Sequence, residues 1–303
     1  MFQEQTAFFL YAESSIHVGS GQALGAVDLA IQREQHTQFP VVPASGLKGA
    51  LRHWFERQED TDQALNTAVF GPDTQNAGDH AGAVAFSDAR LMLFPMRSLR
   101  GVFAWVTCPA VLQRLRRDWA SLGQSAPLGI DEHLLEEREE TVLCSSSTTV
   151  KDKGQILLDE YAFSPRRSDA VGQLAKYLAE NALPDHDAYS YWRKQLRKNV
   201  LVVSNETFRD FTLHSTEVQA RIKIDKKTGT TSGKDGNLFY QENLPPESLF
   251  YALTFAHDDL SGALNGNGSA SDLLNHVRTL DGQRLQIGGD ASIGKGRTAV
   301  HFL

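Results

Sequence analysis

Cysteine and long apolar runs are both scarce in this sequence. Its 303 residues include two cysteines, Cys108 and Cys144, which lie in unrelated settings and so suggest neither a disulfide framework nor a cysteine metal site. No stretch approaches the roughly 20 apolar residues that cross a membrane, and the N-terminal segment 1–12 has neither a basic start nor a long apolar run. We therefore expect a cytoplasmic, globular protein with no membrane partner.

Positive charge is scarce too. The chain has 30 Lys and Arg against 37 Asp and Glu, a formal net charge of −7, whereas nucleic-acid-binding proteins usually carry a basic balance. Because charges more than about 8 Å apart are largely screened at physiological ionic strength, a local basic groove is still compatible with this balance. Many of the acidic residues lie in the tracts 56–62 and 131–140, and such tracts are typical of solvent-exposed faces.

Motifs for tightly bound metal ions are also absent. The sequence has no H-E-x-x-H motif, no paired cysteines and no dense cluster of carboxylates. Any metal ion would therefore be held loosely and shared with a bound ligand.

What the sequence does contain is a dense set of polar features within residues 16–55. An apolar strand ends at His17, and the glycines of the following Gly19-Ser20-Gly21 allow a sharp turn. Asp28 follows in an exposed loop or short strand, and its apolar neighbours predict that its side chain points away from the core. A lone carboxylate of this kind is usually a surface or turn residue.

A helix is predicted over residues 45–57, with Ser45 as its N-cap. Leu47 begins an apolar stripe at helical spacing, and Lys48 and Arg52 share the other face. A helix N-terminus beside two cations is a typical seat for a phosphate. A capped amphipathic helix without any ligand explains the same pattern.

A glycine-rich loop over residues 288–296 lies between the last two predicted strands. Glycines there would let the backbone approach a ligand closely, and two basic side chains add charge; the candidate residues are Gly288, Gly289, Lys295, Gly296 and Arg297. The loop lacks the G-K-[ST] ending of a P-loop and opens no helix. A structural turn explains it equally well, and only its conjunction with the basic helix favours RNA binding.

Helical and strand patterns follow one another as β-α-β-β and later as β-α-β. The first unit combines helix 45–57 with strands at 7–13, 83–93 and 101–106, and the second consists of 249–257, 271–280, 284–287 and 298–303. We therefore predict an α+β fold with a ferredoxin-like (RRM-like) core, as a single domain over residues 1–303. Irregular patterns predict large insertions at roughly 121–168 and 170–215.

A protruding β-hairpin arm is predicted at roughly 217–245. Alternating residues precede a turn rich in Lys, Gly, Thr and Ser, and a second short strand follows at 238–240. The tip of the arm carries Lys223, Lys226, Lys227 and Lys234. Phe239 and Tyr240 would stack on a ligand or, more commonly, anchor the base of the arm.

Together these blocks resemble the RAMP superfamily of CRISPR effectors, and within it the backbone subunits of type III-B (Cmr) complexes. That family opens with H-x-G-S-G, V-D-L-x-I-Q-R-E-x-H-T-x-F-P and S-x-L-K-G-A-L-R, all of which are present between His17 and Arg52. Segment 285–300 resembles the glycine-rich loop that closes RAMP domains, and segments 221–229 and 236–246 resemble the hairpin region.

The resemblance implies a repeated subunit that assembles with other copies of itself and with other Cmr subunits along a guide RNA (crRNA). It implies that Asp28 is needed for metal-dependent cleavage of the complementary target single-stranded RNA at regular intervals. Asp28 would hold Mg²⁺ or another divalent cation, or help align a ribose 2′-hydroxyl. His17 is the first candidate to assist it, and His36 and Glu242 are weaker ones.

Several alternatives stay open. On the main interpretation, the guide would be held by Lys48, Arg52, Lys295 and Arg297. The first alternative is a pure RNA-binding scaffold in which Asp28 is inert. A stand-alone RAMP endoribonuclease that processes precursor crRNA without metal is the second alternative. A type III-A backbone subunit is closely related to the type III-B subunit and is not a different class of protein. Cleavage by a histidine pair without metal has less support.

Overall fold

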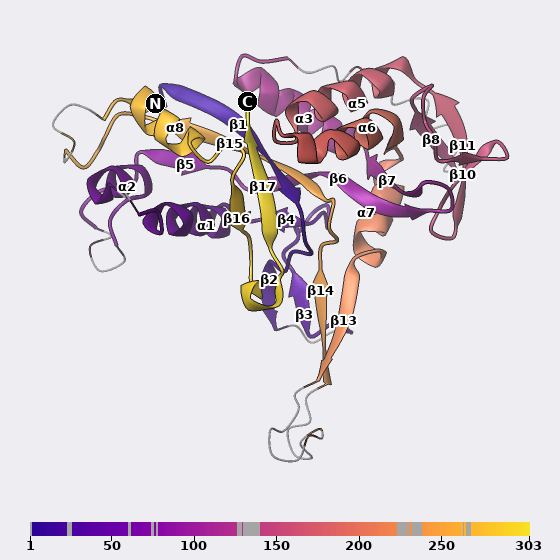
Figure 1. Cartoon of the computed structure of the whole chain (residues 1–303), viewed down its shortest axis with the longest axis horizontal. Coiled ribbons are helices and arrows are strands. Elements are labelled where there is room, and N and C mark those ends of the chain that lie inside the picture. The colour runs from indigo at the N-terminus through magenta and orange to yellow at the C-terminus, as the bar shows by residue number, and fades with distance from the viewer. Residues whose placement is uncertain are drawn as a thin grey trace.

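The computed structural model describes residues 2–22, 26–59, 62–73, 76, 78–125, 129, 140–222, 229, 231, 238–262, 264 and 268–303 (Figure 1). The four lysines predicted at the hairpin tip lie outside the described residues, as does the acidic tract 131–140 apart from Glu140.

β1 (Glu4–Ala12) is a central strand of a large sheet. Its residues are buried from Thr6 to Ala12, because a strand covered on both faces needs a continuous apolar run rather than an alternating one. It pairs antiparallel with β15 (Leu249–Ala256) on one side and with β17 (Arg297–Phe302) on the other. Residues distant in sequence thus form the middle of the sheet.

The large sheet has 13 strands among the described residues. Its order is β16-β17-β1-β15-β6-β7-β12-β8-β11-β10-β9, with β4 beside β6 and β5 beside β15. The remaining strands are β16 (Arg284–Gln286), β6 (Ala89–Ser98), β7 (Val102–Thr107), β12 (Val200–Val202), β8 (Thr141–Cys144), β11 (Tyr161–Arg167), β10 (Gln155–Leu158), β9 (Lys151–Asp152), β4 (Val41–Val42) and β5 (Val84–Phe86).

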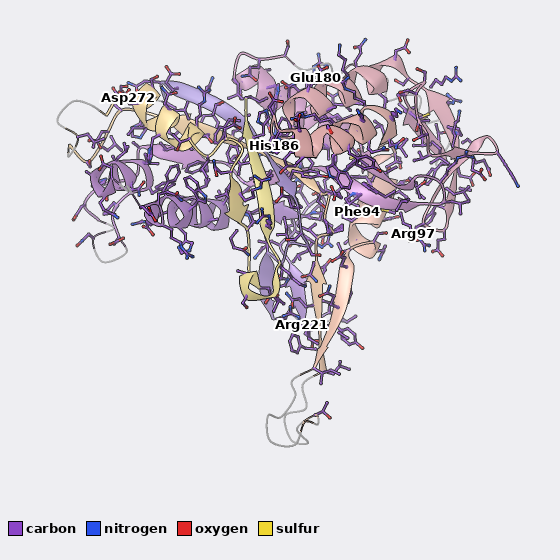
Figure 2. The ribbon with its side chains drawn as sticks, viewed as in Figure 1. Phe94, Arg97, Glu180, His186, Arg221 and Asp272 are labelled. Atoms are coloured by element: carbon purple, nitrogen blue, oxygen red, sulfur yellow. The ribbon has the colours of Figure 1, made fainter. Side chains whose placement is uncertain are left out.

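Six strands of this sheet close into a ring. The run β6-β7-β12-β8-β11-β10 ends on a strand that pairs back with β6 through Leu158 and Ser98. Phe94 of β6, labelled in Figure 2, is fully buried where the ring meets the rest of the sheet. The segments predicted as insertions therefore supply strands of the sheet itself.

The helices pack apolar stripes against the sheet. They are α1 (Ala44–Glu56), α2 (Gln63–Phe70), α3 (Pro109–Ser121), α5 (Asp169–Asn181), α6 (Ser190–Asn199), α7 (Asn205–His214) and α8 (Ala270–Arg278). Serine N-caps begin three of them, since Ser168, Ser204 and Ser269 each accept a hydrogen bond from a backbone N–H in the first turn. No helix of the described residues is long and apolar enough to span a bilayer.

A second, four-stranded sheet projects from the body of the molecule (Figure 1). It consists of β13 (Glu217–Ile222), β14 (Leu238–Asn243), β3 (Leu29–Ile31) and β2 (Gly19–Gln22), in that order. β13 and β14 pair antiparallel from Glu217–Asn243 to Ile222–Leu238. The predicted hairpin is therefore present, and the motif stretch after His17 forms the other half of its sheet.

The predicted α+β architecture is confirmed in its coarse form, as a mixture of helices and strands around a β-sheet core. The prediction contained no closed ring, because the pairing of Leu158 with Ser98 joins two distant segments and leaves no periodic signal in either. The strand expected over 83–93 is two strands, β5 and β6, since Ser87 and Asp88 interrupt the pairing.

Candidate nucleic-acid interface and cleavage site

Asp28 lies at the exposed start of β3, beside the hairpin. Its Oδ2 accepts a hydrogen bond from the backbone N–H of Tyr240 at 2.7 Å. Val27 is partly buried on one side of it and Leu29 on the other, so the carboxylate is the exposed group of this turn. The structure therefore fixes Asp28 against β14 while leaving its charge accessible to a ligand.

His17 contacts the same hairpin strand from the neighbouring segment. Its Nδ1 lies 2.7 Å from the backbone carbonyl oxygen of Glu242. Because a carbonyl oxygen only accepts, Nδ1 must carry the proton, and Nε2 is the acceptor of the neutral ring. A Cβ at Gly19 would lie 2.9 Å from Nε2, so glycine keeps this nitrogen free of steric overlap.

The carboxylate of Glu242 joins three segments of the small sheet. It is buried and accepts hydrogen bonds from Arg33 at 2.5 Å, from Thr216 Oγ1 at 2.8 Å and from the backbone N–H of Ile31 at 3.1 Å. Both oxygens of the carboxylate are thus hydrogen-bonded to the protein. Glu242 supports β3 and His17, and does not present a free carboxylate beside Asp28.

Arg33 and Thr216 were missed by the sequence analysis although Arg33 stands inside the Q-R-E motif. Arg33 also donates to the backbone carbonyls of Gln38 and Thr212. A basic residue between polar neighbours gives no sign that it is buried, so only its position in the motif could have identified it.

His36, the other weak candidate, lies elsewhere. Its side chain is 74% exposed, and its Nε2 is 3.1 Å from a guanidinium nitrogen of Arg114 and 4.0 Å from Glu34. Burial raises the pKa of the Glu34 carboxyl, but the hydrogen bonds from Arg114 and Thr37 and the charge of Arg114 together outweigh burial and lower that pKa. His36 therefore belongs to a separate charged surface on α3.

The glycine-rich loop packs on the segment that carries His17. A Cβ at Gly288 would lie 2.2 Å from the carbonyl oxygen of His17, and the N–H of Gly289 donates to that oxygen at 2.9 Å. The backbone of Gly296 is left-handed, with φ of 81°, and its N–H donates to the Ser15 carbonyl at 2.8 Å. These glycines thus allow close approach to the protein's own backbone.

Lys295 is buried, against the expectation of an accessible cation. It is 7% exposed, and its Nζ donates to Gln219 Oε1 at 2.8 Å and to Asn243 Oδ1 at 2.7 Å. Burial, followed by the charge of Arg221, lowers the pKa of Lys295. Its ammonium group therefore ties the loop to both strands of the hairpin.

Two further contacts strengthen this attachment of the loop to the hairpin. Asp290 forms an ion pair with Arg221 at 3.1 Å and accepts a hydrogen bond from the Gln241 amide at 2.5 Å. Figure 2 shows Arg221 in the projecting sheet, near the far end of the described part of β13. Arg297, at the end of the loop, is 62% exposed and pairs with Glu13 at 2.7 Å.

The basic face of α1 differs from the prediction in one respect. The helix begins at Ala44 with Pro43 as its N-cap, so Ser45 lies in the first turn and does not cap the helix. Proline fits before the helix because it has no N–H to satisfy and its φ is fixed near the value found here, −58°. Ser45 remains exposed, with its hydroxyl free to face a ligand.

The two cations of α1 are bound differently. Arg52 pairs with Glu56 at 2.7 Å and with Asp73 at 2.5 Å. Lys48 makes no ion pair with a described residue, and burial, with a smaller contribution from Arg52, lowers its pKa. Lys48 is therefore the candidate cation with the fewest protein partners.

The donors around Asp28 suit only a loosely held metal ion. The described residues contain no group of three or more His, Cys, Asp or Glu that could share a metal. Mg²⁺ commonly keeps several waters and binds through one or two carboxylates together with substrate phosphates. One accessible carboxylate fits that mode of binding and does not fit an all-protein cage.

These features define a class of protein in which a hairpin sheet and a glycine-rich loop support one exposed carboxylate. The sequence pattern of the RAMP superfamily matches residues 9–299, and the chain belongs to that superfamily.

Two individual proteins are similar to this chain over nearly its whole length. The chain is 34% identical over 292 residues, 96% of this chain and 93% of the relative, to the protein of Pyrococcus furiosus named CRISPR system Cmr endoribonuclease Cmr4. It is 24% identical over 315 residues, 98% of this chain and 96% of the relative, to CRISPR system CMR subunit Cmr4 of Saccharolobus solfataricus.

Solved structures show the same likeness. Oligomeric Cmr4 from Pyrococcus furiosus matches with a TM-score of 0.70 and 26% identity over 99% of both chains. A chain of the type III-B Cmr-beta complex bound to cognate target RNA matches with a TM-score of 0.74 over 99% of this chain and 98% of that one. At 20% identity, the second match shows a shared fold.

Proposed function

We propose that this chain is the repeated backbone subunit of a type III-B CRISPR ribonucleoprotein and cleaves target RNA. The observation that carries the proposal is the accessible carboxylate of Asp28, fixed to the hairpin by the Tyr240 N–H at 2.7 Å. The identity of 34% with a protein named Cmr endoribonuclease Cmr4 supports the activity. Its partners would be crRNA, complementary single-stranded RNA, further copies of itself and other Cmr subunits, in the cytoplasm.

RNA would be held through its backbone, and base pairing with the guide would supply the sequence specificity. Lys48, which makes no ion pair with a described residue, would supply positive charge, with Ser45 and Arg52 on the same helix. Arg297 adds a second exposed cation. The residues of the glycine-rich loop would affect RNA binding indirectly. They position the segment of His17 and the hairpin, which would contact the RNA; these residues are Gly288, Gly289, Lys295 and Gly296.

Cleavage would be centred on Asp28. Its carboxylate would accept the proton of a ribose 2′-hydroxyl or orient that hydroxyl in line with the adjacent phosphate. His17, with the proton fixed on Nδ1, presents Nε2 as the nitrogen that accepts a proton. A divalent cation such as Mg²⁺, held by Asp28 and RNA phosphates, would stabilise the developing negative charge.

The core of the chain fits a ferredoxin-like unit. The chain passes in order through β1, α1, β6, β15, α8 and β17, and the four strands lie in the spatial order β17-β1-β15-β6. Every neighbouring pair is antiparallel. This order of elements supports a βαββαβ core to which the ring and the small sheet are added.

The test assembles the protein with crRNA and partner subunits and adds labelled complementary RNA, with Mg²⁺ or with a chelator. Wild type should give regularly spaced products that require the metal, and Asp28→Ala should bind target without cutting it. Unchanged cutting by Asp28→Ala would leave this chain a scaffold. Cleavage of precursor crRNA by the isolated chain without metal would instead identify a processing enzyme.

A further inference from the structure

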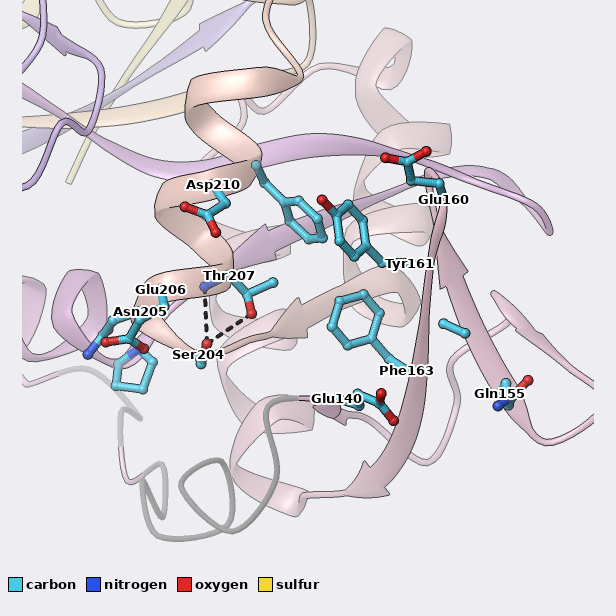
Figure 3. A pocket seen from close by; sticks show the side chains of 13 residues that line it. Glu140, Gln155, Glu160, Tyr161, Phe163, Ser204, Asn205, Glu206, Thr207 and Asp210 are labelled. Atoms are coloured by element: carbon cyan, nitrogen blue, oxygen red, sulfur yellow. Dashed lines mark hydrogen bonds between the residues drawn. The ribbon is translucent and has the colours of Figure 1, made fainter.

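A cavity of about 700 Å³ opens between the ring and α7, and its lining contains none of the residues named for the proposed RNA site (Figure 3). The strands β10 and β11 form one side of it and the first turns of α7 form the other. Figure 1 shows β10 and β11 at one end of the molecule, whereas α7 lies between them and β13 of the small sheet.

One wall of the cavity is aromatic and held in place by ring contacts. Tyr161 is 50% exposed, although its ring lies edge-on to Phe211 with centroids 5.7 Å apart. Phe163 also meets Phe211 edge-on, at 6.0 Å. Because Phe163 and Phe211 are buried, they hold the Tyr161 ring in place while half of this residue remains exposed.

Four carboxylates stand among neutral residues in the rest of the lining. Glu140, Glu160 and Glu206 line the cavity and form no ion pair with a described residue, whereas Asp210 already pairs with Arg209 at 3.0 Å. The cavity therefore combines a half-exposed tyrosine with three carboxylates that have no cationic partner among the described residues.

The helix N-termini at this cavity do not reverse that charge. Ser204 accepts from the backbone N–H of Thr207 at 3.1 Å, and the Asn205 side chain accepts from the N–H of Ala110 at 2.9 Å. Backbone donors that could attract an anion are therefore occupied in part by the protein itself, and phosphate would face the three carboxylates.

We infer that this cavity receives an arginine side chain of a partner protein. A guanidinium is planar, stacks on aromatic rings and makes paired hydrogen bonds to carboxylates, all of which this lining offers. A lysine ammonium would lose the stacking contact. RNA is disfavoured as the occupant, because its phosphates would meet carboxylates that have no cationic partner among the described residues. Protein binding and RNA binding would therefore use different surfaces of the chain.

The test titrates the purified full chain with N-acetyl-arginine N-methylamide and follows binding by saturation-transfer NMR. We expect saturable binding in the millimolar range, with much weaker binding of the uncharged citrulline analogue. Tyr161→Ala and the double variant Glu160→Gln/Glu206→Gln should each weaken binding roughly tenfold.

Matched controls replace exposed residues of the same types elsewhere. Tyr191→Ala, at a tyrosine that is 59% exposed on α6, and Glu59→Gln, after α1, should leave the affinity unchanged. The inference is overturned if wild type shows no saturable binding, if the cavity variants bind as wild type does, or if a single-stranded RNA oligonucleotide competes for the same site.

Discussion

The two sheets of this molecule differ in what holds them together. In the large sheet, β1 is buried along seven consecutive residues and the surrounding core is apolar. In the small sheet, Val218, Ile222 and Leu238 are each at least half exposed, and the buried contacts are polar, as at Glu242 and Lys295. Stability therefore resides mainly in the large sheet, and the small sheet carries the groups that could meet RNA.

This division has a physical basis. Apolar burial is non-directional and tolerates large assemblies of strands, whereas a site needs polar groups held in fixed directions. The polar network around Glu242 gives β3 and the segment of His17 a defined position at the cost of burying charge. Changes in the two sheets should consequently separate loss of folding from loss of function.

The largest expected loss of stability comes from a substitution in the large sheet. Phe9→Ala removes a fully buried ring that packs on Trp119 at 5.8 Å between centroids, and should lower the free energy of unfolding by about 3–5 kcal/mol. Denaturant titration measures this loss. The small-sheet counterpart Leu238→Ala, at 52% exposure, should cost less than about 1 kcal/mol; equal losses would refute the division.

The next largest loss of stability is expected when the polar network of the small sheet is broken. Glu242→Ala leaves Arg33, whose side chain is 13% exposed, without its carboxylate, and should cost about 3 kcal/mol. The exposed pair provides the control, because Glu56→Ala removes only a surface partner of Arg52 and should change stability by less than about 1 kcal/mol. A small effect at Glu242 would mean that the network does not position β3.

A smaller effect of pH on stability is expected at Glu247, in the turn before the central strand β15. Burial raises the pKa of Glu247 to about 7, so the folded protein holds this proton more tightly than the unfolded chain does. The stabilisation that protonated Glu247 contributes is fully present below about pH 4.5 and is lost as the pH rises through about 7. Glu247→Gln should remove roughly 1–2 kcal/mol of this decline between about pH 5 and pH 8.

Denaturant titrations at both pH values measure that change, with Glu59→Gln as the exposed control. The prediction fails if the wild type and Glu247→Gln lose stability in parallel as pH rises.

The smallest expected effect is on RNA affinity, and it compares Lys48 on α1 with Lys295 in the glycine-rich loop. Lys48→Ala should weaken RNA binding several-fold and reduce the slope of log affinity against log salt by about 1. Lys295→Met should leave that slope unchanged and lower stability instead, because its ammonium serves Gln219 and Asn243. Filter-binding titrations over a salt series distinguish the two, and identical slopes for both variants would contradict the assignment.

Local patterns predicted much of this fold and part of the site. Helix α1, the hairpin and the exposure of Asp28 followed from periodicity and turn residues within short windows. The ring, the burial of Lys295 and the network of Arg33 depend on contacts between segments far apart in the chain. Charge alone does not reveal such contacts, because a lysine in a loop has the same local pattern whether it faces RNA or Asn243.

The most direct measurement compares wild type and Asp28→Asn in assembled complexes. Asparagine keeps an oxygen for the Tyr240 N–H and removes the charge, so stability and target affinity should be unchanged. The cleavage rate should fall at least about a hundredfold. Wild-type cleavage by Asp28→Asn, or loss of folding and target binding together with cleavage, would contradict a cleavage site centred on Asp28.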